Sequence, residues 1–554
     1  MPTLPRMERE PSRDTLLAMD YTDILRSEDP RIREAAKTHL HLNKVPILPE
    51  WNIKPHQIET LQWLYEREKT SFMGIRGGIV ALDMGLGKSL TVTVHSLSRE
   101  RGRYPTLLVC SKTLLSSWRG DLTKFFGKAW VDEKVIFLHR DYCKLDSVTL
   151  AACREAELVI TAYPSCASAW SAVQHRKTTK EPSSHKGLDV LYDIEWTRVV
   201  LDESQTICNP DTNNYKAVTV LRAACKVCLT GTPLRNYDED LLSQLVFLGI
   251  TPVPYKKAWN ASRFKDMGLD CVVLSMSYEY AGITLPNKDD FHVLVKMSPE
   301  EEKWYTFVKT KAVDVYNEMD KRIAGIGYAN VLAMITMLRQ SCLAPYLISQ
   351  SDKNSAVLED MKDSELVQWL TNKEGTAGMQ SAKSRAVLAT LEGLANKRVV
   401  VFSMFSSYLH LLEELLQRLG RPCLLFDGSL KSKDREEVVR RFNEEDKPWV
   451  LLINYKIGSE GLNLQICNEA IFLEPWWTPT AEKQAVRRVW RCGQENEVHC
   501  YFILVGSSIE ERMIELCDKK TAICNEYAGK PVTKRDEAET GYLLGVRDLS
   551  GRRI

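Results

Sequence analysis

The stretch that decides the fold is IVALDMGLGKSLTVTVHSL, residues 79–97, where an apolar run leads through a glycine-containing turn into a helix-like run. The turn contains Gly85, Gly87, Lys88 and Ser89. Backbone N–H groups in such a turn face phosphate oxygens, a lysine neutralises the β/γ charge, and a serine hydroxyl can ligate Mg²⁺. The pattern therefore predicts a phosphate-binding loop between a strand and a helix.

This loop departs from the strict consensus at one position, where Leu82 replaces the expected glycine. The alternative is a structural turn that binds no phosphate, and the flanking strand and helix disfavour it. The residues expected to contact the nucleotide are Asp83, Met84, Gly85, Leu86, Gly87, Lys88 and Ser89.

A second acidic element follows in TRVVLDESQ, residues 197–205. An apolar run ends at Asp202, which we expect to hold Mg²⁺ together with Ser89. Glu203 would orient and deprotonate the attacking water. An exposed acidic turn remains the alternative, although it does not explain why the acids end an apolar strand.

Short apolar runs alternate with longer amphipathic stretches in two series, which is typical of parallel α/β sheets. The first series is GIVALD (78–83), TLLVCS (106–111), KVIFLH (134–139), ELVITA (157–162), TRVVLDE (197–203) and KVCLTG (226–231). The second is KRVVVFS (397–403), PCLLFDG (422–428), WVLLINY (449–455), EAIFLEP (469–475) and HCYFILV (499–505). Two α/β lobes are predicted.

The remaining segments complete the predicted organisation. Helical periodicity dominates between the two strand series, and SPEE at 298–301 has the pattern of a capping box. The polar stretch before the second series suits a linker able to hinge. The expected divisions are an unassigned extension (1–50), the first lobe (51–254), a helical insert (255–350), a linker (351–383), the second lobe (384–530) and a tail (531–554).

Composition limits the protein class. The 554 residues are 44% hydrophobic and 27% charged, and no apolar run approaches the ~18 residues of a membrane span. The start MPTLPRMEREPSRD does not resemble a secretory signal, so we expect an intracellular protein. Fifteen cysteines are scattered, and the close pair Cys225 and Cys228 has no second pair, so no zinc site is expected.

Net charge is only +1, so affinity for nucleic acid would need a local basic surface. The best candidate is KQAVRRVWR, residues 483–491, although a run of charges is more often a solvated helix face.

Six motifs carry a resemblance to a known family. They are DMGLGKS (83–89), LDESQTICNP (201–210), LTGTPLRN (229–236), LRQSCLAPYL (338–347), GSEGLNL (458–464) and QAVRRVWRCGQ (484–494). Their order and spacing over residues 52–513 resemble the switch/sucrose-nonfermenting ATPases of helicase superfamily 2. The resemblance implies two RecA-like lobes with a helical insert, ATP and Mg²⁺ as cofactors, and translocation along double-stranded DNA.

The block at 474–494 looks closest to the subgroup of repair translocases and transcription-release ATPases, here without a RING zinc module. For this family the location would be the nucleus in a eukaryote, or wherever DNA is handled in a virus or bacterium. The partner on DNA would be a complex such as a nucleosome or a polymerase.

The resemblance also implies individual roles. Gln57 in KPHQ would read the adenine edge, and Arg488 and Arg491 would approach the nucleotide, with Arg491 the better finger for the γ-phosphate. Residues expected to couple the nucleotide site to lobe closure are Gln205, Thr230, Thr232, Gly461 and Gln494. Residues expected to line the DNA groove are Lys112, Ser116, Trp118, Lys456, Ser459 and Asn463, with a structural role for Trp118 at least as plausible.

The chain departs from the family at four positions. Ser204 and Gln205 stand where the family has alanine and histidine, and Arg487 and Trp490 replace aspartate and histidine. For Ser204 and Gln205 we expect altered coupling rather than lost hydrolysis, because neither position supplies the metal ligand or the base. Arg487 and Trp490 would retune the placement of the arginines or the affinity for DNA. Two further readings stay open, a strand-separating DNA or RNA helicase and a non-catalytic DNA-binding scaffold.

Overall fold

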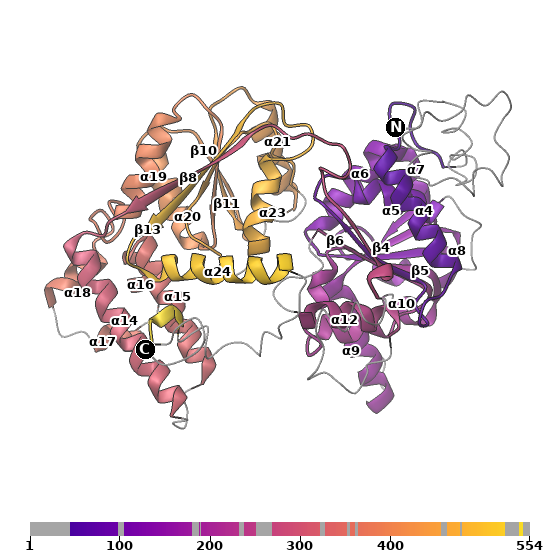
Figure 1. The fold of residues 1–554 in the computed structure, drawn as a ribbon, viewed down its shortest axis with the longest axis horizontal. Coiled ribbons are helices and arrows are strands. Elements are labelled where there is room, and N and C mark those ends of the chain that lie inside the picture. Colours follow the sequence, from indigo (N-terminus) through magenta and orange to yellow (C-terminus); the bar gives the residue numbers. More distant parts are fainter. Residues whose placement is uncertain are drawn as a thin grey trace. The chain divides into compact units, whose positions relative to one another are not determined.

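The computed structural model divides the chain into two compact units, one extending to Thr284 and the other from Leu285 to Glu526 (Figure 1). The structure describes residues 45–97, 105–179, 188, 190–231, 238–250, 269–321, 327–351, 355–360, 364–430, 432–455, 462–476, 479–526 and 542–546.

The first unit is built on a seven-stranded parallel sheet in the order β3-β4-β2-β5-β6-β1-β7. Its strands are β1 (Gly77–Leu82), β2 (Thr106–Cys110), β3 (Val135–Phe137), β4 (Leu158–Ala162), β5 (Glu195–Leu201), β6 (Arg222–Thr230) and β7 (Val273–Met276). All six predicted strands are confirmed. Because the strands are parallel, the residues that follow β1, β5 and β6 meet at one edge of the sheet.

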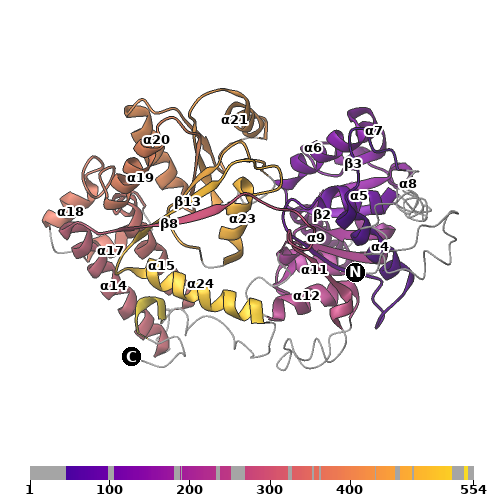
Figure 2. The ribbon, with the colours of Figure 1, turned by 45° about the horizontal axis from the view of Figure 1, so that its top comes forward.

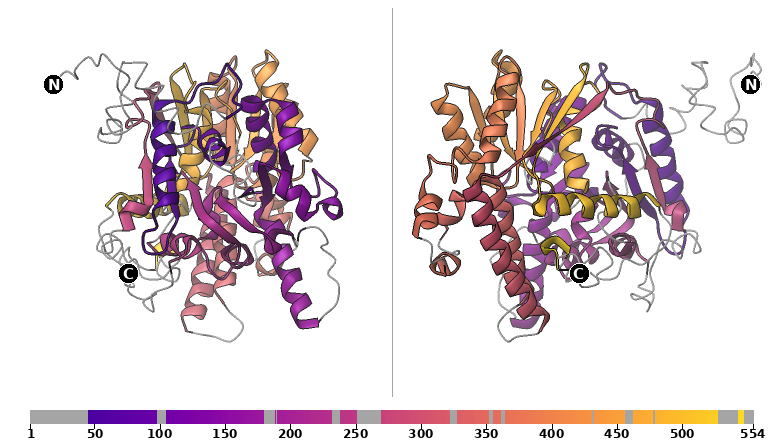
Figure 3. Two further views of the ribbon diagram at one scale, coloured as in Figure 1. Left: turned by 90° about the vertical axis from the view of Figure 1, so that its right-hand side faces the viewer. Right: turned by 60° about the vertical axis from the view of Figure 1, so that its left-hand side comes forward.

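Helices flank this sheet (Figure 3). They are α4 (Pro55–Lys69), α5 (Lys88–Leu97), α6 (Leu114–Phe126), α7 (Lys128–Lys134), α8 (Leu150–Glu155), α9 (Tyr163–Thr179), α10 (Val190–Asp193), α11 (Asn213–Thr219) and α12 (Asp238–Leu248). Single 3₁₀ turns lie at η2 (Leu145–Ser147), η3 (Ser204–Ile207) and η5 (Leu269–Val272). Residues of β1, β2 and β4 are all buried, as expected for a parallel sheet covered on both faces.

The second unit contains a six-stranded parallel sheet in the order β10-β11-β9-β12-β13-β8. Its strands are β8 (Lys288–Val295), β9 (Val399–Ser403), β10 (Cys423–Phe426), β11 (Val450–Asn454), β12 (Glu469–Phe472) and β13 (Val498–Val505). Successive residues of β9 enter different cores: Val399 and Val401 lie in one, Val400 and Phe402 in the other. Two parallel α/β sheets therefore confirm the predicted fold class.

The helices of the second unit include a separate packed group (Figure 2). The helices are α14 (Pro299–Asp320), α15 (Tyr328–Leu343), α16 (Tyr346–Ser349), α17 (Ser355–Glu359), α18 (Ser364–Thr371), α19 (Ala382–Gly393), α20 (Ser406–Arg418), α21 (Ser432–Glu444), α23 (Pro479–Val489) and α24 (Ile509–Glu526). Helices α14, α15, α18 and α24 share one hydrophobic core. The predicted capping box is confirmed, because the Ser298 hydroxyl and the Glu301 carboxylate bond reciprocally to each other's backbone N–H.

The segment 255–350 is not purely helical, which corrects the expected insert. It contains β7, which pairs with β1 of the first unit, and β8, which pairs with β13 of the second. Strand β8 was missed because KDDFHVLV is charged at its start and mostly exposed, as an edge strand tolerates.

The expected linker at 351–383 also differs from the structure. It includes α18, and its last residue, Lys383, is fully buried and donates to both Glu510 carboxylate oxygens at 2.6 and 2.8 Å. Polar composition suggested a solvated hinge, whereas several of these polar groups are satisfied inside the unit. Among the residues described, no helix is both long and apolar enough to cross a bilayer.

Candidate nucleotide site

The phosphate loop joins β1 to α5, as the sequence predicts. Gly85 and Gly87 have φ values of 89° and 80°, in the left-handed region that favours glycine. A Cβ on Gly87 would come within 2.1 Å of the Gln57 amide nitrogen. The loop therefore needs glycine at this position for its backbone conformation and for its close approach to α4.

Gln57 and His56 of α4 contact the loop directly. The Gln57 amide nitrogen donates to the carbonyl oxygens of Leu86 and Gly87 at 3.4 and 3.5 Å, and its amide oxygen accepts from the Lys54 N–H at 2.9 Å. The His56 Nε2 atom lies 3.1 Å from the Leu86 carbonyl oxygen. Gln57 thus lies beside the loop, and its reading of adenine stays a prediction.

Lys88 is the first residue of α5, and its ammonium group donates to the Leu82 carbonyl oxygen at 2.8 Å. The loop is held from a second side by Tyr278, which follows β7. Its N–H donates to the Asp83 carboxylate at 3.2 Å and its hydroxyl donates to the Met84 carbonyl oxygen. Sequence reasoning missed Tyr278, because it lies 194 residues beyond Met84 and matches no motif.

The acidic pair lies directly after β5. The Asp202 N–H donates to the Val109 carbonyl oxygen at 2.8 Å, which continues the pairing with β2. Burial, followed by the charge of Glu203, raises the pKa of Asp202 to about 7, while a hydrogen bond from Trp118 and the charge of Lys88 lower it. Glu203 has a φ of 48°, a left-handed conformation that is uncommon for a residue with a Cβ and that clusters at functional sites.

Gln205 links the acidic pair to β6. Its amide nitrogen donates to the Glu203 carboxylate at 2.6 Å, and its amide oxygen accepts from the Thr230 hydroxyl at 2.9 Å. The neighbouring Ser204 hydroxyl donates to the Gln244 amide oxygen at 2.7 Å. Gln205 therefore keeps a connection between the expected base and the end of β6. Thr232 lies outside the described residues.

The donor set fits a hard divalent cation. Asp202 and Glu203 are consecutive carboxylates, and the raised pKa of Asp202 reflects burial and the charge of Glu203, which its other neighbours do not fully compensate. Carboxylate and hydroxyl oxygens are the ligands that Mg²⁺ prefers. The roles of Asp202 and Ser89 as metal ligands stay predictions.

The second unit carries the arginine motif on and after α23. Arg488 is buried, and Arg491 is partly exposed. The Gln494 amide nitrogen donates to three backbone carbonyl oxygens, those of Gln465, Cys467 and Val489, at 3.0, 3.0 and 3.1 Å. Because the Gln494 N–H also donates to the Arg491 carbonyl oxygen at 3.0 Å, Gln494 fixes the turn that carries Arg491.

The substitutions Arg487 and Trp490 contact each other. The Arg487 guanidinium lies over the Trp490 ring, 4.4 Å from its centroid, within the range of a cation–π contact. The Trp490 indole N–H donates to the Pro286 carbonyl oxygen at 2.8 Å. These residues therefore help to hold the arginine motif on its own unit.

Comparison with known families decides the identity. Residues 56–347 match the SNF2-related domain, and residues 382–493 match the helicase conserved C-terminal domain. The chain belongs to the SNF2-related ATPase family. Gln57, the phosphate loop, the acidic pair and Gln205 all fall within the first match, and Arg488 and Arg491 fall within the second.

Two viral proteins of similar length are among its relatives. A protein of Invertebrate iridescent virus 6 named as a helicase, 172L, is 31% identical over 91% of this chain and 96% of its own length. A protein of Orgyia pseudotsugata multicapsid polyhedrosis virus named as a global transactivator is 29% identical over 90% and 96%.

A third relative is longer than this chain. A solved structure is also among the matches. The DNA repair protein RAD5 of Yarrowia lipolytica is 26% identical over 88% of this chain and 58% of its own length. The Sulfolobus solfataricus SWI2/SNF2 ATPase core, solved in complex with dsDNA, is 22% identical over 87% of this chain and 94% of its own, with a TM-score of 0.37. So low a TM-score does not establish a shared arrangement.

One of the expected DNA contacts of this SNF2-related chain is corrected. Trp118 is only 2% exposed and its indole N–H is bonded within the protein, so its side chain is not available to DNA. Lys112, Ser116 and Asn463 are exposed and stay predictions, with Lys112 3.5 Å from the Asp141 carboxylate. Lys456, Ser459 and Gly461 lie outside the described residues.

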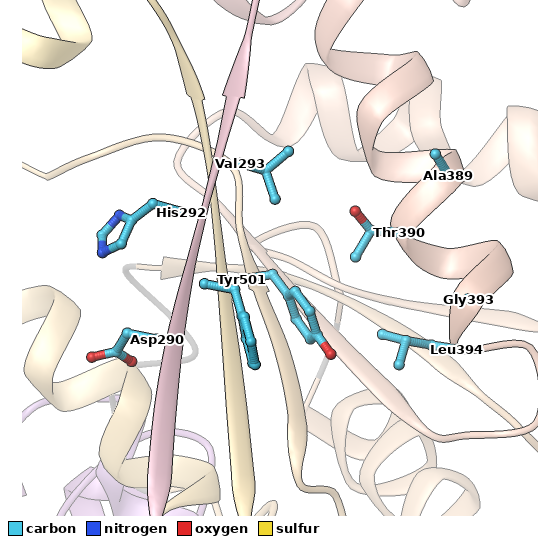
Figure 4. A pocket seen from close by; sticks show the side chains of 9 residues that line it. Asp290, His292, Val293, Ala389, Thr390, Gly393, Leu394 and Tyr501 are labelled. Carbon is cyan, nitrogen blue, oxygen red and sulfur yellow. The ribbon is translucent and has the colours of Figure 1, made fainter.

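A pocket of about 570 Å³ in the second unit lies apart from these motifs (Figure 4). It is lined by β8, by α19 and by Tyr501 of β13. Val293 and His292 project to opposite sides of β8. None of the predicted site residues lines this pocket.

Proposed function

We propose that this SNF2-related ATPase uses ATP and Mg²⁺ to translocate along double-stranded DNA and so remodels protein–DNA complexes. The observation that carries the proposal is the chain of hydrogen bonds from Glu203 through Gln205 to Thr230. It connects the expected catalytic base to Thr230, the last residue of β6, which lies in LTGTP (229–233). The resemblance assigns to this motif the coupling of hydrolysis to movement. Because the expected base stays hydrogen-bonded to this motif through Gln205, we favour a motor over a non-catalytic scaffold.

In the proposed reaction, the residues of the first unit bind the triphosphate and activate water. Lys88 would leave the Leu82 carbonyl and neutralise the β/γ-phosphates, and Asp202 and Ser89 would hold Mg²⁺. Bound Mg²⁺ supplies charge neutralisation at the phosphate oxygens. Glu203, oriented by the Gln205 amide, accepts a proton from the attacking water.

The second unit would complete the reaction. Arg491, with Arg488, would stabilise charge on the transferring phosphoryl group when the two units close around ATP. If DNA binding favours that closure, DNA stimulates turnover, and repeated closure moves the protein along the duplex.

The names of the relatives support DNA as the partner. Membership of the subgroup of repair translocases and transcription-release ATPases is part of the proposal. A relative named as a DNA repair protein and one named as a global transactivator both align over most of this chain. These names favour a role in repair or transcription, with a DNA-bound complex such as a nucleosome or a polymerase as the target.

A strand-separating helicase is the second candidate, because the relative that is 31% identical is named as a helicase. A strand-displacement assay distinguishes the two, since only the helicase releases a labelled strand from a duplex with single-stranded tails.

The proposed function is tested by steady-state ATP hydrolysis without nucleic acid and with single-stranded DNA, double-stranded DNA or duplex RNA. We expect strong stimulation of hydrolysis by double-stranded DNA, and at least a ~10²-fold loss of kcat in Glu203→Gln. Equal, unstimulated rates in both proteins would favour the scaffold instead.

A further inference from the structure

Trp118 lies on α6, and its side chain reaches Asp202 at the end of β5. The side chain is 2% exposed, and its indole N–H donates to the Asp202 Oδ2 atom at 2.8 Å. The other carboxylate oxygen, Oδ1, accepts from the Glu203 N–H at 3.0 Å. Each oxygen of Asp202 is therefore held by one fixed donor.

A further donor fixes the backbone of the same residue. The Tyr163 hydroxyl, at the start of α9, donates to the Asp202 carbonyl oxygen at 2.9 Å. Tyr163 is 1% exposed, so this contact is also buried. Two aromatic side chains from two helices thus hold Asp202, one through its backbone and one through its carboxylate.

We propose that Trp118 is a positioning residue for the metal site: its indole N–H fixes the rotation of the Asp202 carboxylate so that the remaining lone pairs face Mg²⁺. This inference rests on the proposed function, in which Asp202 is a metal ligand. Groups that hydrogen-bond to a metal ligand orient it, and their loss typically weakens metal affinity by about 10- to 100-fold.

A purely structural tryptophan offers the contrast within the same unit. Trp196 is fully buried in β5, and its indole N–H donates to the Leu191 backbone carbonyl oxygen at 3.0 Å. Trp118 and Trp196 are therefore alike in burial and in having a satisfied N–H, but only the N–H of Trp118 is bonded to the carboxylate of the acidic pair. Their phenylalanine variants form a matched pair.

The experiment measures Mn²⁺ binding to the full chain by electron paramagnetic resonance, in the presence of a non-hydrolysable ATP analogue. Binding of the same analogue in EDTA is measured separately. Trp118→Phe is expected to weaken Mn²⁺ binding by about 10- to 100-fold and to leave metal-free analogue binding unchanged. Trp196→Phe is expected to match the wild type in both measurements.

A second variant removes the donor without changing the shape. Benzothienylalanine at position 118 replaces the indole N–H by sulfur, and it is expected to reproduce the loss of Mn²⁺ affinity even if Trp118→Phe folds poorly. Wild-type Mn²⁺ affinity in the benzothienyl variant would overturn the role of Trp118.

Asp202→Asn separates this inference from the proposed function beneath it. The account expects Asp202→Asn to lose Mn²⁺ affinity. If Asp202→Asn bound Mn²⁺ as the wild type does, Asp202 would not be the metal ligand, and the proposed function would fail at that point rather than the role of Trp118 alone.

Discussion

Gln205 shows how a departure from the family pattern can retain chemistry. Its amide has both a donor and an acceptor, so it bonds simultaneously to the Glu203 carboxylate and to the Thr230 hydroxyl. Glu203 itself has a left-handed backbone conformation, which sets the direction in which its side chain leaves the backbone. A residue that differs from the family can therefore still connect Glu203, the proposed base, to β6.

Replacing Gln205 by leucine should slow turnover while preserving nucleotide binding. A lost hydrogen bond to a charged group costs about 1.5–3 kcal/mol, or roughly 10- to 100-fold in kcat, with KM for ATP little changed. Gln205→His should retain most activity. Ser204→Ala is the control, because Ser204 bonds to Gln244 rather than to the acidic pair; a wild-type kcat for Gln205→Leu would contradict the proposed link.

The sequence identifies the residues that belong to motifs, but not the residues that support them. Lys88, Asp202 and Glu203 follow from local patterns, because their chemistry needs a strand end or a tight turn. Trp118 and Tyr278 reach the site across 84 and 194 residues of chain, and no local signal marks such contacts. The strand order that brings them there is not encoded in any short segment.

At the scale of elements, a buried charge cluster joins three parts of the first unit. Glu68 of α4 lies 3.0 Å from the Arg198 guanidinium of β5 and 3.1 Å from the His95 ring of α5. Burial alone would raise the pKa of Glu68, but the bond from His95 and the charge of Arg198 outweigh burial and lower it to about 2. The cluster therefore connects α4, α5 and the central sheet.

This cluster makes the stability of the first unit depend on pH. Because the folded pKa of Glu68 lies below the unfolded value, its contribution is present above about pH 4.5 and is lost as pH falls towards 2. Glu68→Gln should cost about 2 kcal/mol at pH 7 and less at pH 3. Hydrogen exchange over α4 and β5 measures this, with exposed Glu66→Gln as the control; an equal cost at both pH values would refute the pKa argument.

In the second unit, the buried ion pair of Lys383 and Glu510 connects α19 to α24. Lys383→Met should destabilise this unit by about 3–5 kcal/mol, because it leaves Glu510 buried without its partner. Adding Glu510→Gln should recover part of that loss. Hydrogen exchange over α19 and α24 reports both values, and strictly additive losses would show that the two groups do not interact.

The strands that were predicted and those that were missed differ in burial. The eleven apolar runs form strands whose residues are largely buried, and these hydrophobic residues make the strands recognisable. Strand β7 is only partly buried, and β8 is an edge strand with exposed Phe291 and Leu294. Exposed strands are defined by their pairing partners, so composition alone does not reveal them.

At the scale of the whole molecule, the proposed motor divides its chemistry between two units. The first carries the phosphate loop and the acidic pair, and the second carries the arginine motif. Neither unit alone contains the full set of residues that the proposed reaction requires, which explains why hydrolysis would depend on their relative movement.

Arg491→Ala should therefore abolish DNA-stimulated turnover without preventing nucleotide binding to the first unit. Loss of an arginine finger lowers kcat by roughly 10³- to 10⁵-fold. Arg440→Ala serves as the control, because Arg440 lies exposed on α21 and pairs with Glu437 and Glu444. Turnover by Arg491→Ala at the wild-type rate would remove Arg491 from the mechanism.

The central claim is that ATP hydrolysis moves this protein along double-stranded DNA, and triplex displacement tests it most directly. A labelled third strand is bound to a duplex, and its release is followed with ATP, with a non-hydrolysable analogue and with Glu203→Gln. We predict ATP-dependent release by the wild type alone, with the underlying duplex intact. An intact triplex despite DNA-stimulated ATP hydrolysis would contradict translocation.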